Sequence, residues 1–203
     1  MISTELFTWL QGATFYLGLH EKAVETLPRG ESKTWIDVGC GPGLVARLAA
    51  SRGYDTTGID IDPSMILEAN RIARREKSMA QFYVGSIANL PTEPVDVVSA
   101  ASLLAVLGNR EEGLRTLWKS TRVGGTLLII EPTEQMTTKN ANKLIRERSI
   151  PSHRSVGLRL WAFARQNNIV NPDVYQTLEA KSVQFVPLLD GLVGAWIIKK
   201  HEK

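Results

Sequence analysis

Residues 37–43 read Asp-Val-Gly-Cys-Gly-Pro-Gly and join a short apolar run, 34–38, to a helix-favouring run, 44–51. An apolar run that ends in a glycine cluster is typical of a buried strand, and Gly53 stands where the following helix would be capped. Glycines at such a junction let the backbone approach a ligand closely. The stretch therefore predicts a ligand-binding loop between a strand and a helix of an α/β fold.

The alternation of strand and helix continues after this loop. We expect strands at 55–61, 80–84, 95–100 and 126–130, and helices from Asp62-Pro63 to about Glu76 and from about Glu111 to Thr121. Helical crossovers make the strands parallel, which predicts a Rossmann-like, doubly wound α/β sheet. The runs 182–188 and 192–199 are joined by Asp190-Gly191, a link too short for a crossover. They complete a seven-stranded, mostly parallel sheet with an antiparallel C-terminal hairpin at its edge.

The chain length of 203 residues fits one domain, 1–203. Residues 1–30 read as an N-terminal helical cap, because a helix-like pattern runs to about residue 27 and Pro28-Arg29-Gly30 breaks it. Residues 133–178 interrupt the alternation with helical, basic and turn-rich sequence. We interpret them as an insertion over the carboxyl edge of the sheet, where ligands bind in open α/β folds.

The charge of the chain is unevenly distributed. Residues 133–169 carry seven Lys or Arg against two Glu, a local charge of +5, so the net charge of +3 leaves about −2 for the remainder. The basic character is therefore local and does not indicate general nucleic-acid affinity. No apolar run approaches the roughly 18–20 residues that span a bilayer. Residues 1–8 lack a secretory pattern, and Cys40 is the only cysteine, so we expect a cytoplasmic protein without a membrane partner.

The spacing of the glycines distinguishes two classes of ligand. A dinucleotide fingerprint is G-x-G-x-x-G, whereas these glycines fall at 39, 41 and 43 and an acid, Asp37, precedes them. Asp60 ends the second strand, 21 residues after Gly39, where an acid can accept hydrogen bonds from ribose hydroxyls. Asp62 precedes a proline and a helix, so it reads as an N-cap. Asp60 has no such structural task in the sequence and is expected at the ribose.

Four segments together resemble a known family. They are 37–43, Gly58–Met65, Val95–Ser99 and Arg122–Leu127, each at a strand end or a turn. In this order they are similar to the motifs of class I S-adenosylmethionine-dependent methyltransferases of the small-molecule type. The resemblance covers about residues 33–131 and the terminal hairpin. It implies S-adenosylmethionine as the cofactor.

The resemblance also implies roles for single residues. They are Asp37 at the methionine end, the backbone of Gly39, Cys40 and Gly41 as a cradle, Asp60 at the ribose, Ile61 and Met65 beside the adenine, Ser86 and Ile87 at its polar edge, and Ser99, Ala100 and Ser102 near the sulfonium and the methyl. Two departures stand out. Ser86 replaces the usual acid, and Ala105-Val106 stand where many small-molecule members carry two histidines.

The sequence leaves the catalytic residues and the acceptor open. Direct methyl transfer needs orientation more than a base, and the weak candidates for a base are Tyr16 and His20 on the N-terminal helix and His153 in the insertion. Ser99-Ala100-Ala101-Ser102 is unlike the motif of enzymes that methylate planar amino groups. No Asp/Glu/His cluster indicates a metal.

The basic insertion suggests what the acceptor could be. Its side chains Lys143, Arg146, Arg154 and Arg159, with Trp161 and Phe163 interleaved, fit an anionic or aromatic small molecule, or RNA phosphate. The alternative is a solvated helix face with its aromatics packed onto the sheet. A nucleic acid is disfavoured because the chain has no room for a separate RNA-binding module. The sequence is compatible with an oligomer.

Three functions compete. The leading one is an enzyme that methylates a small molecule. The second is a non-catalytic S-adenosylmethionine-binding protein used for regulation or assembly, suggested by the absent histidine pair and by Ser86. The third, a nicotinamide-dependent oxidoreductase, is disfavoured by the glycine spacing.

Overall fold

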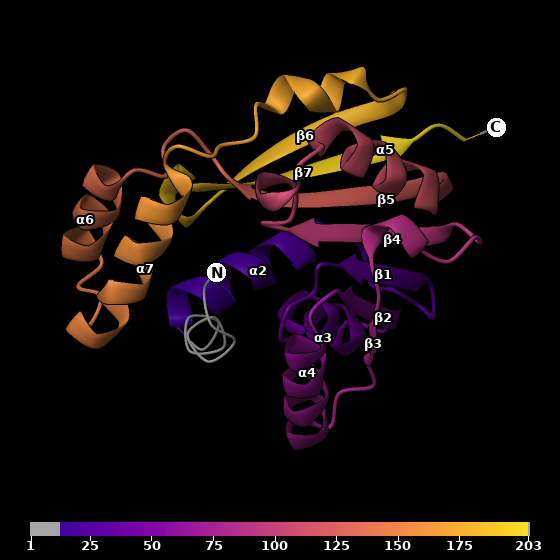
Figure 1. The fold of residues 1–203 in the computed structure, drawn as a ribbon, viewed down its shortest axis with the longest axis horizontal. Coiled ribbons are helices and arrows are strands. Elements are labelled where there is room, and N and C mark those ends of the chain that lie inside the picture. Colours follow the sequence, from indigo (N-terminus) through magenta and orange to yellow (C-terminus); the bar gives the residue numbers. More distant parts are fainter. Residues whose placement is uncertain (1–12, 203) are drawn as a thin grey trace.

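The computed structural model describes residues 13–202, which form one sheet with helices on both faces (Figure 1). The helices are α2 (Thr14–Glu25), α3 (Leu44–Ser51), α4 (Pro63–Glu76), α5 (Arg110–Ser120), α6 (Thr138–Glu147) and α7 (Ser152–Arg165). The strands are β1 (Thr34–Val38), β2 (Asp55–Asp60), β3 (Gln81–Val84), β4 (Val95–Ala101), β5 (Thr121–Pro132), β6 (Ala180–Leu188) and β7 (Val193–Lys200). Short 3₁₀ turns lie at η1 (Ile87–Asn89), η2 (Leu104–Val106), η3 (Pro172–Thr177) and η4 (Leu189–Gly191).

The strand order is β3-β2-β1-β4-β5-β7-β6. Strands β1 to β5 are parallel, whereas β7 is antiparallel to both β5 and β6. The doubly wound sheet of seven strands and its antiparallel hairpin are thereby confirmed. The chain runs outward from β1 to β3 and then returns to β4, so the switch point that holds ligands in such sheets lies at the carboxyl ends of β1 and β4.

Local sequence explains most element boundaries. Helix α4 begins as expected, since the Asp62 carboxylate accepts the N–H of Ser64 at 2.8 Å and Pro63 occupies the first helical position. Strand β5 is longer than predicted and begins at Thr121. Gly124, at φ 72°, lies inside it, and the register of β5 with β4 shifts between Val95 and Val97. Gly124 and Gly125, which precede the strand expected at 126–130, thus form an irregularity within the observed strand.

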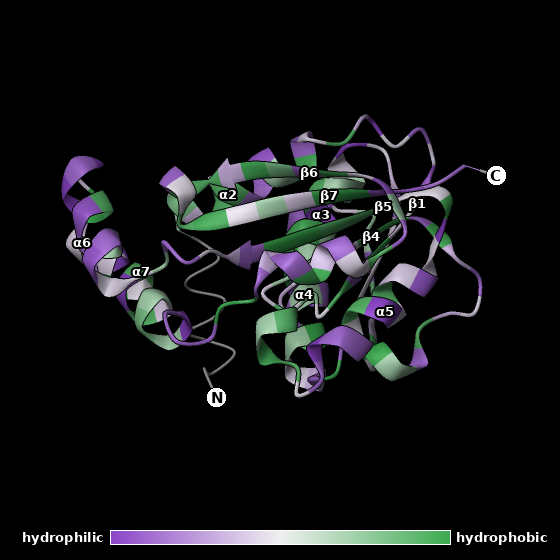
Figure 2. Cartoon of the chain, turned by 90° about the horizontal axis from the view of Figure 1, so that it is seen from above, coloured by the Kyte–Doolittle hydropathy of each residue, from purple (hydrophilic) through white to green (hydrophobic). Residues whose placement is uncertain are grey.

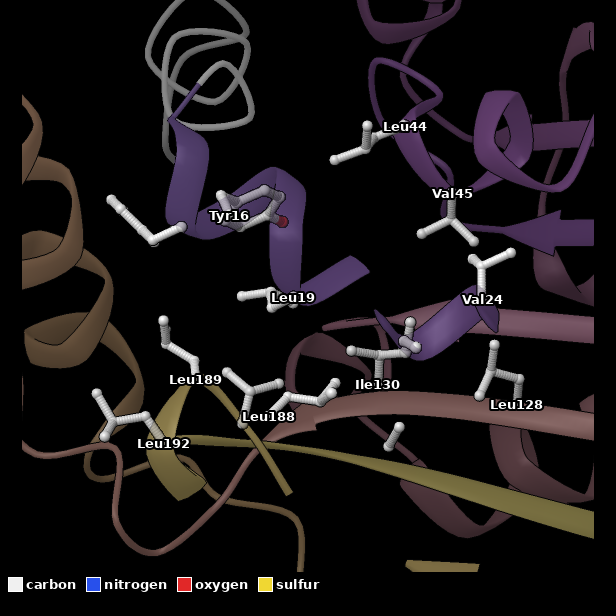
Figure 3. Packing of buried hydrophobic residues seen from close by; sticks show 14 of the residues in the cluster. Tyr16, Leu19, Val24, Leu44, Val45, Leu128, Ile130, Leu188, Leu189 and Leu192 are labelled. Atoms are coloured by element: carbon white, nitrogen blue, oxygen red, sulfur yellow. The ribbon is translucent and has the colours of Figure 1, made fainter. Parts of the chain in front are cut away.

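The core divides into layers above and below the sheet. One cluster joins α2 and α3 to the inner strands and to the β6–β7 turn, with Leu19, Leu188, Leu189 and Leu192 among its members (Figure 3). Another lies under α5, η2 and η3 on the opposite face. Figure 2 shows hydrophobic colouring along most of β5 and alternating colouring on the helices.

Helix α2 matches part of the helix expected over residues 1–27, and residues 1–12 lie outside the described residues.

The segment expected as an insertion contains α6, α7 and η3. Helices α6 and α7 pack against each other and lie beyond the carboxyl ends of β4 and β5, at the left of Figure 1. Apolar side chains of both helices belong to the same buried cluster as α2. Within residues 13–202, every helix is too short or too polar to cross a membrane.

Candidate functional site

The loop between β1 and α3 turns sharply at its three glycines. Gly39, Gly41 and Gly43 have φ of 69°, 52° and 79°, a region that favours glycine. A Cβ on Gly39 would also lie 2.9 Å from the Leu103 side chain, and one on Gly43 would lie 2.4 Å from the Phe82 ring. The loop therefore needs glycine for both conformation and space.

The backbone N–H groups of this loop are already used. Those of Gly39 and Cys40 donate to the Ile59 carbonyl at 2.8 and 3.0 Å, and that of Gly41 donates to the Asp60 carboxylate at 2.8 Å. Gly43 donates to Cys40 at 2.9 Å, and Pro42 has no N–H. A pyrophosphate cradle offers such groups to the ligand. This loop instead presents two acids, a pattern that suits a cation better than a phosphate.

Asp37 is the acid beneath the loop. Its side chain is 1% exposed, and one carboxylate oxygen accepts the Ser99 hydroxyl at 2.7 Å. Ser99 in turn accepts the indole N–H of Trp35 at 2.7 Å. Burial raises the pKa of Asp37 to about 7, whereas the Ser99 hydrogen bond acts in the opposite direction. The carboxyl is thus oriented by the Ser99 hydroxyl of β4.

Asp60 has a structural role that the sequence did not reveal. Its carboxylate accepts the N–H of Gly41 at 2.8 Å and the N–H of Asp62 at 2.9 Å. The premise that Asp60 lacks a structural task is therefore wrong, because it ties the end of β2 to the glycine loop. A carboxylate has about four acceptor positions, so it can still receive ribose hydroxyls. The expectation that Asp62 caps α4 is confirmed.

The residues expected around the adenine lie at the ends of β2 and β3. The Ile61 side chain is 73% exposed, whereas Met65 and Ile87 are half-buried. An apolar side chain so exposed at a carboxyl edge is available to cover a planar ring. The Ser86 hydroxyl accepts the N–H of Ala88 at 3.2 Å and so caps η1.

Cys40 is buried among apolar side chains, and burial raises the pKa of its thiol, so it does not act as a thiolate.

The residues expected near the methyl group follow β4. Ser99 and Ala100 have fully buried side chains, and the Ser99 hydroxyl is committed to Asp37 rather than directed to a ligand. Ser102 is half-buried, has φ of 55°, and donates its N–H to the Ile130 carbonyl at 2.8 Å. The structure thus brings Ser99 and Asp37 together and places Ser102 at the start of the segment that faces the glycine loop.

Two of the three candidates for a base lie together. His20 is buried on α2, its Nδ1 lies 2.8 Å from the Tyr16 carbonyl, and the two rings are 4.4 Å apart. A carbonyl only accepts, so Nδ1 carries the proton; burial lowers the pKa of His20 to about 4, which makes its other nitrogen a weak base. His153 is exposed in the first turn of α7.

The basic insertion is partly paired within itself. Arg159 donates to Asn142 at 2.8 Å, and Lys143 lies 3.8 Å from Glu147. Trp161 is buried against Tyr16 with ring centres 5.3 Å apart, which agrees with the alternative that the aromatics pack, but Phe163 on the same helix is 69% exposed. The insertion therefore combines a packed face with an exposed one.

One buried acid was missed in the sequence. Glu131, near the end of β5, is fully buried and accepts the N–H of Leu104 at 2.8 Å. The available signal was a single acid within the otherwise apolar run 127–132. In the described part of the chain, no cluster of His, Cys, Asp and Glu is arranged to hold a metal.

Comparisons with known proteins agree with this geometry. A family model described as a methyltransferase domain matches residues 36–129. The trans-aconitate 2-methyltransferase of Azoarcus sp. (strain BH72) is 27% identical to this chain. The matched region covers 84% of this chain and 69% of the relative's length. The ubiquinone biosynthesis O-methyltransferase of Rickettsia akari (strain Hartford) is 30% identical over 46% of this chain and 38% of its own. The first of the curated relatives are matched over only about two fifths of their length.

The fold has a close counterpart among solved structures. A SAM-dependent methyltransferase from Aquifex aeolicus superposes with a TM-score of 0.70 at 14% identity, covering 98% of this chain and 99% of that one. The segment matched by the family model includes the glycine loop and strands β2 to β4, and these elements carry most of the site described above. Over residues 36–129 the chain is thus similar to the methyltransferase domain family, and its fold is that of solved S-adenosylmethionine-dependent methyltransferases.

Proposed function

We propose that this protein transfers the methyl group of S-adenosylmethionine to a small-molecule acceptor by direct in-line displacement. The observation that carries the proposal is the glycine loop, whose N–H groups are used internally and whose two acids, Asp37 and Asp60, border the site. A zwitterionic ligand with an ammonium and a ribose suits this loop better than a dinucleotide does. The cofactor supplies an activated methyl group, so the chain has mainly to bind and orient.

The proposal assigns tasks to the chain's own residues. Asp37 would bind the ammonium and Asp60 the ribose, with the backbone of Gly39, Cys40 and Gly41 between them. Ile61, Met65 and Ile87 would enclose the adenine, and Ser86 would accept from its amino group. Ala100 and Ser102 would line the methyl side. Ser99 would act by holding Asp37, because its hydroxyl already bonds that carboxyl.

The acceptor is proposed to be an anionic or aromatic small molecule that enters beside α6 and α7. The local charge of +5 over residues 133–169 supports an anion. The name of one relative specifies trans-aconitate, an anion, and that of another specifies ubiquinone biosynthesis. A base is required only if the acceptor must lose a proton, and Tyr16, His20 and His153 are the candidates.

The remaining parts of the proposal concern the whole chain. Residues 1–203 would form one domain, with 1–30 as a cap and 133–178 as the acceptor side, located in the cytoplasm. The non-catalytic alternative receives no support, since the relatives are named as methyltransferases. A nicotinamide cofactor is disfavoured by the occupied N–H groups of the loop.

Calorimetric titration with S-adenosylhomocysteine and with NAD tests the cofactor. We expect binding of the former and none of the latter; the reverse result would overturn the proposal. Radiolabelled methyl transfer into a metabolite extract then tests the activity, with Asp37→Ala as the inactive control. Binding without any labelled product across broad acceptor panels would favour the non-catalytic alternative.

A further inference from the structure

Glu131 is a buried acid outside the cofactor residues assigned so far. It and Asp37 are the two acids that are buried among residues 13–202. Its Oε1 accepts the N–H of Leu104 at 2.8 Å, whereas Oε2 has no hydrogen-bond partner within the described residues. Burying a carboxyl that is only half satisfied costs stability. A function that depends on it would explain why an acid is buried at this position.

Glu131 is one of three points that hold the segment after β4. Ser102 donates its N–H to Ile130 at 2.8 Å, Leu104 donates to Glu131, and the Ala105 carbonyl accepts the side-chain amide of Asn168. The first two anchors lie on β5, and the third lies between α7 and η3, within residues 133–178. Glu131 is the only one of the three whose side chain reaches from the sheet.

The held segment lies against the glycine loop. The Leu103 side chain stands so close to Gly39 that a Cβ there would be 2.9 Å away. Leu103 is directly bonded to Leu104, whose N–H Glu131 holds. Loss of the hydrogen bond from Leu104 to Glu131 would consequently let the Leu103 side chain shift beside Gly39.

The charged and titratable groups around Glu131 come from three further elements. Burial raises its pKa to about 7, whereas the N–H groups of Leu104 and Ala105, Arg165 on α7 and Arg110 on α5 favour the ionised form. Tyr175 on η3 packs on the same side of the sheet and its hydroxyl is likewise without a partner in the described part. Burial, and then the charge of Glu131, raise the pKa of that hydroxyl, so Tyr175 stays neutral.

We propose that Glu131 is a positioning residue for methyl transfer: by holding the N–H of Leu104, it fixes the segment after β4 against the glycine loop. The proposal rests on the proposed function, in which this segment borders the methyl side of the cofactor. Glu131 does not touch the reacting atoms. It acts through Leu104 and Leu103 on the shape of the site.

The test uses Glu131→Ala, Glu131→Gln and, as a control, Tyr175→Phe in the full chain. Amide hydrogen exchange at Leu104 and calorimetric binding of S-adenosylhomocysteine are measured for each. Glu131→Ala should raise the rate of amide exchange at Leu104 about tenfold. It should also weaken binding of S-adenosylhomocysteine about tenfold, as expected for a lost hydrogen bond to a charged acceptor. Glu131→Gln keeps an acceptor oxygen and should return both to within about twofold of wild type. Tyr175→Phe should change neither.

Two results would overturn the proposal. One is a folded Glu131→Ala protein with wild-type exchange and affinity; the other is a Glu131→Gln protein as defective as an alanine variant. If Glu131→Ala does not fold, the glutamine variant decides alone, since loss of protection at Leu104 in it contradicts the proposal. A wild-type protein that fails to bind S-adenosylhomocysteine would refute the proposed function instead. Amide exchange at Leu104 in the Glu131 variants would still test whether Glu131 holds that segment.

Discussion

If the buried carboxyl of Asp37 binds the ammonium group as proposed, ligand binding depends on pH. The pKa of Asp37 in the folded protein is about 7, against an ordinary value of 3.8, because burial penalises the charge. An ammonium ligand pairs with the ionised form, so affinity should fall as the pH drops through 7. We expect S-adenosylhomocysteine to bind about tenfold more weakly at pH 6 than at pH 8, as measured by calorimetry. Asp37→Asn should bind weakly at both values and show no such slope.

The same shift predicts the effect of Asp37→Asn on stability. A raised pKa in the folded state means that the contribution of Asp37 is fully present below the unfolded pKa and is lost as the pH rises through 7. Asparagine retains an oxygen that can accept from Ser99 but carries no charge. The ligand-free variant should therefore melt above wild type at pH 8 and lose that advantage toward pH 4. A lower melting temperature at pH 8 would contradict this account.

Asp60 and Asp62 provide a matched pair of substitutions. Asp60→Ala removes the acceptor for two backbone N–H groups, so it should cost about 1–3 kcal/mol of unfolding free energy and also weaken binding of S-adenosylhomocysteine. Asp62→Ala removes an N-cap, so it should lower the free energy of unfolding by less than Asp60→Ala does and leave that binding within about twofold. Urea unfolding and calorimetry measure the two effects. Equal binding by both variants would exclude Asp60 from the ligand site.

At the scale of elements, the sequence predicted what depends on neighbours along the chain. The bounds of β1 and α3 followed from a short apolar run, a glycine cluster and Gly53, and the structure reproduces both. The start of β5 at Thr121 did not follow, because the strand passes through Gly124 at φ 72°, and the N–H of Gly124 donates to the carbonyl of His201, far along the chain, at 3.0 Å.

The site shows the same division between local and distant information. The glycine loop was recognisable because its residues are contiguous. The hydrogen bond from Gly41 to Asp60 and that from Leu104 to Glu131 join segments 19 and 27 residues apart, so no local pattern records them. The commitment of Ser99 to Asp37, 62 residues away, was hidden for the same reason.

Helix α6 carries the next prediction, because Lys139 and Arg146 are exposed on it beside the carboxyl edge. If the acceptor is an anion, replacing both residues with glutamate should raise the KM for that acceptor several-fold, by removing electrostatic attraction. Binding of S-adenosylhomocysteine should not change. Lys119→Glu, on an exposed site near the end of α5, is the matched control. An unchanged KM in the double variant would argue for a neutral aromatic acceptor.

For the whole molecule, the question is whether residues 133–178 unfold with the sheet. Trp161 of α7 packs on Tyr16 of α2, and both belong to a cluster that also contains Leu128 and Val193 of the sheet. A core shared in this way predicts one cooperative transition. Trp161→Ala should then lower the unfolding free energy of the entire chain by about 3–5 kcal/mol, because a large cavity opens in that shared core.

The exposed ring on the same helix provides the control. Phe163→Ala removes an aromatic side chain that is 69% exposed, so it should change the unfolding free energy by no more than about 0.5 kcal/mol. Urea curves followed by far-UV circular dichroism and by tryptophan fluorescence should coincide for wild type and for both variants. If Trp161→Ala instead separates an early loss of helix from a later loss of the sheet, the insertion is a folding unit of its own. The acceptor side could then open without disturbing the cofactor loop, and the segment after β4 would be held by Ile130 and Glu131 of β5 without the anchor at Asn168.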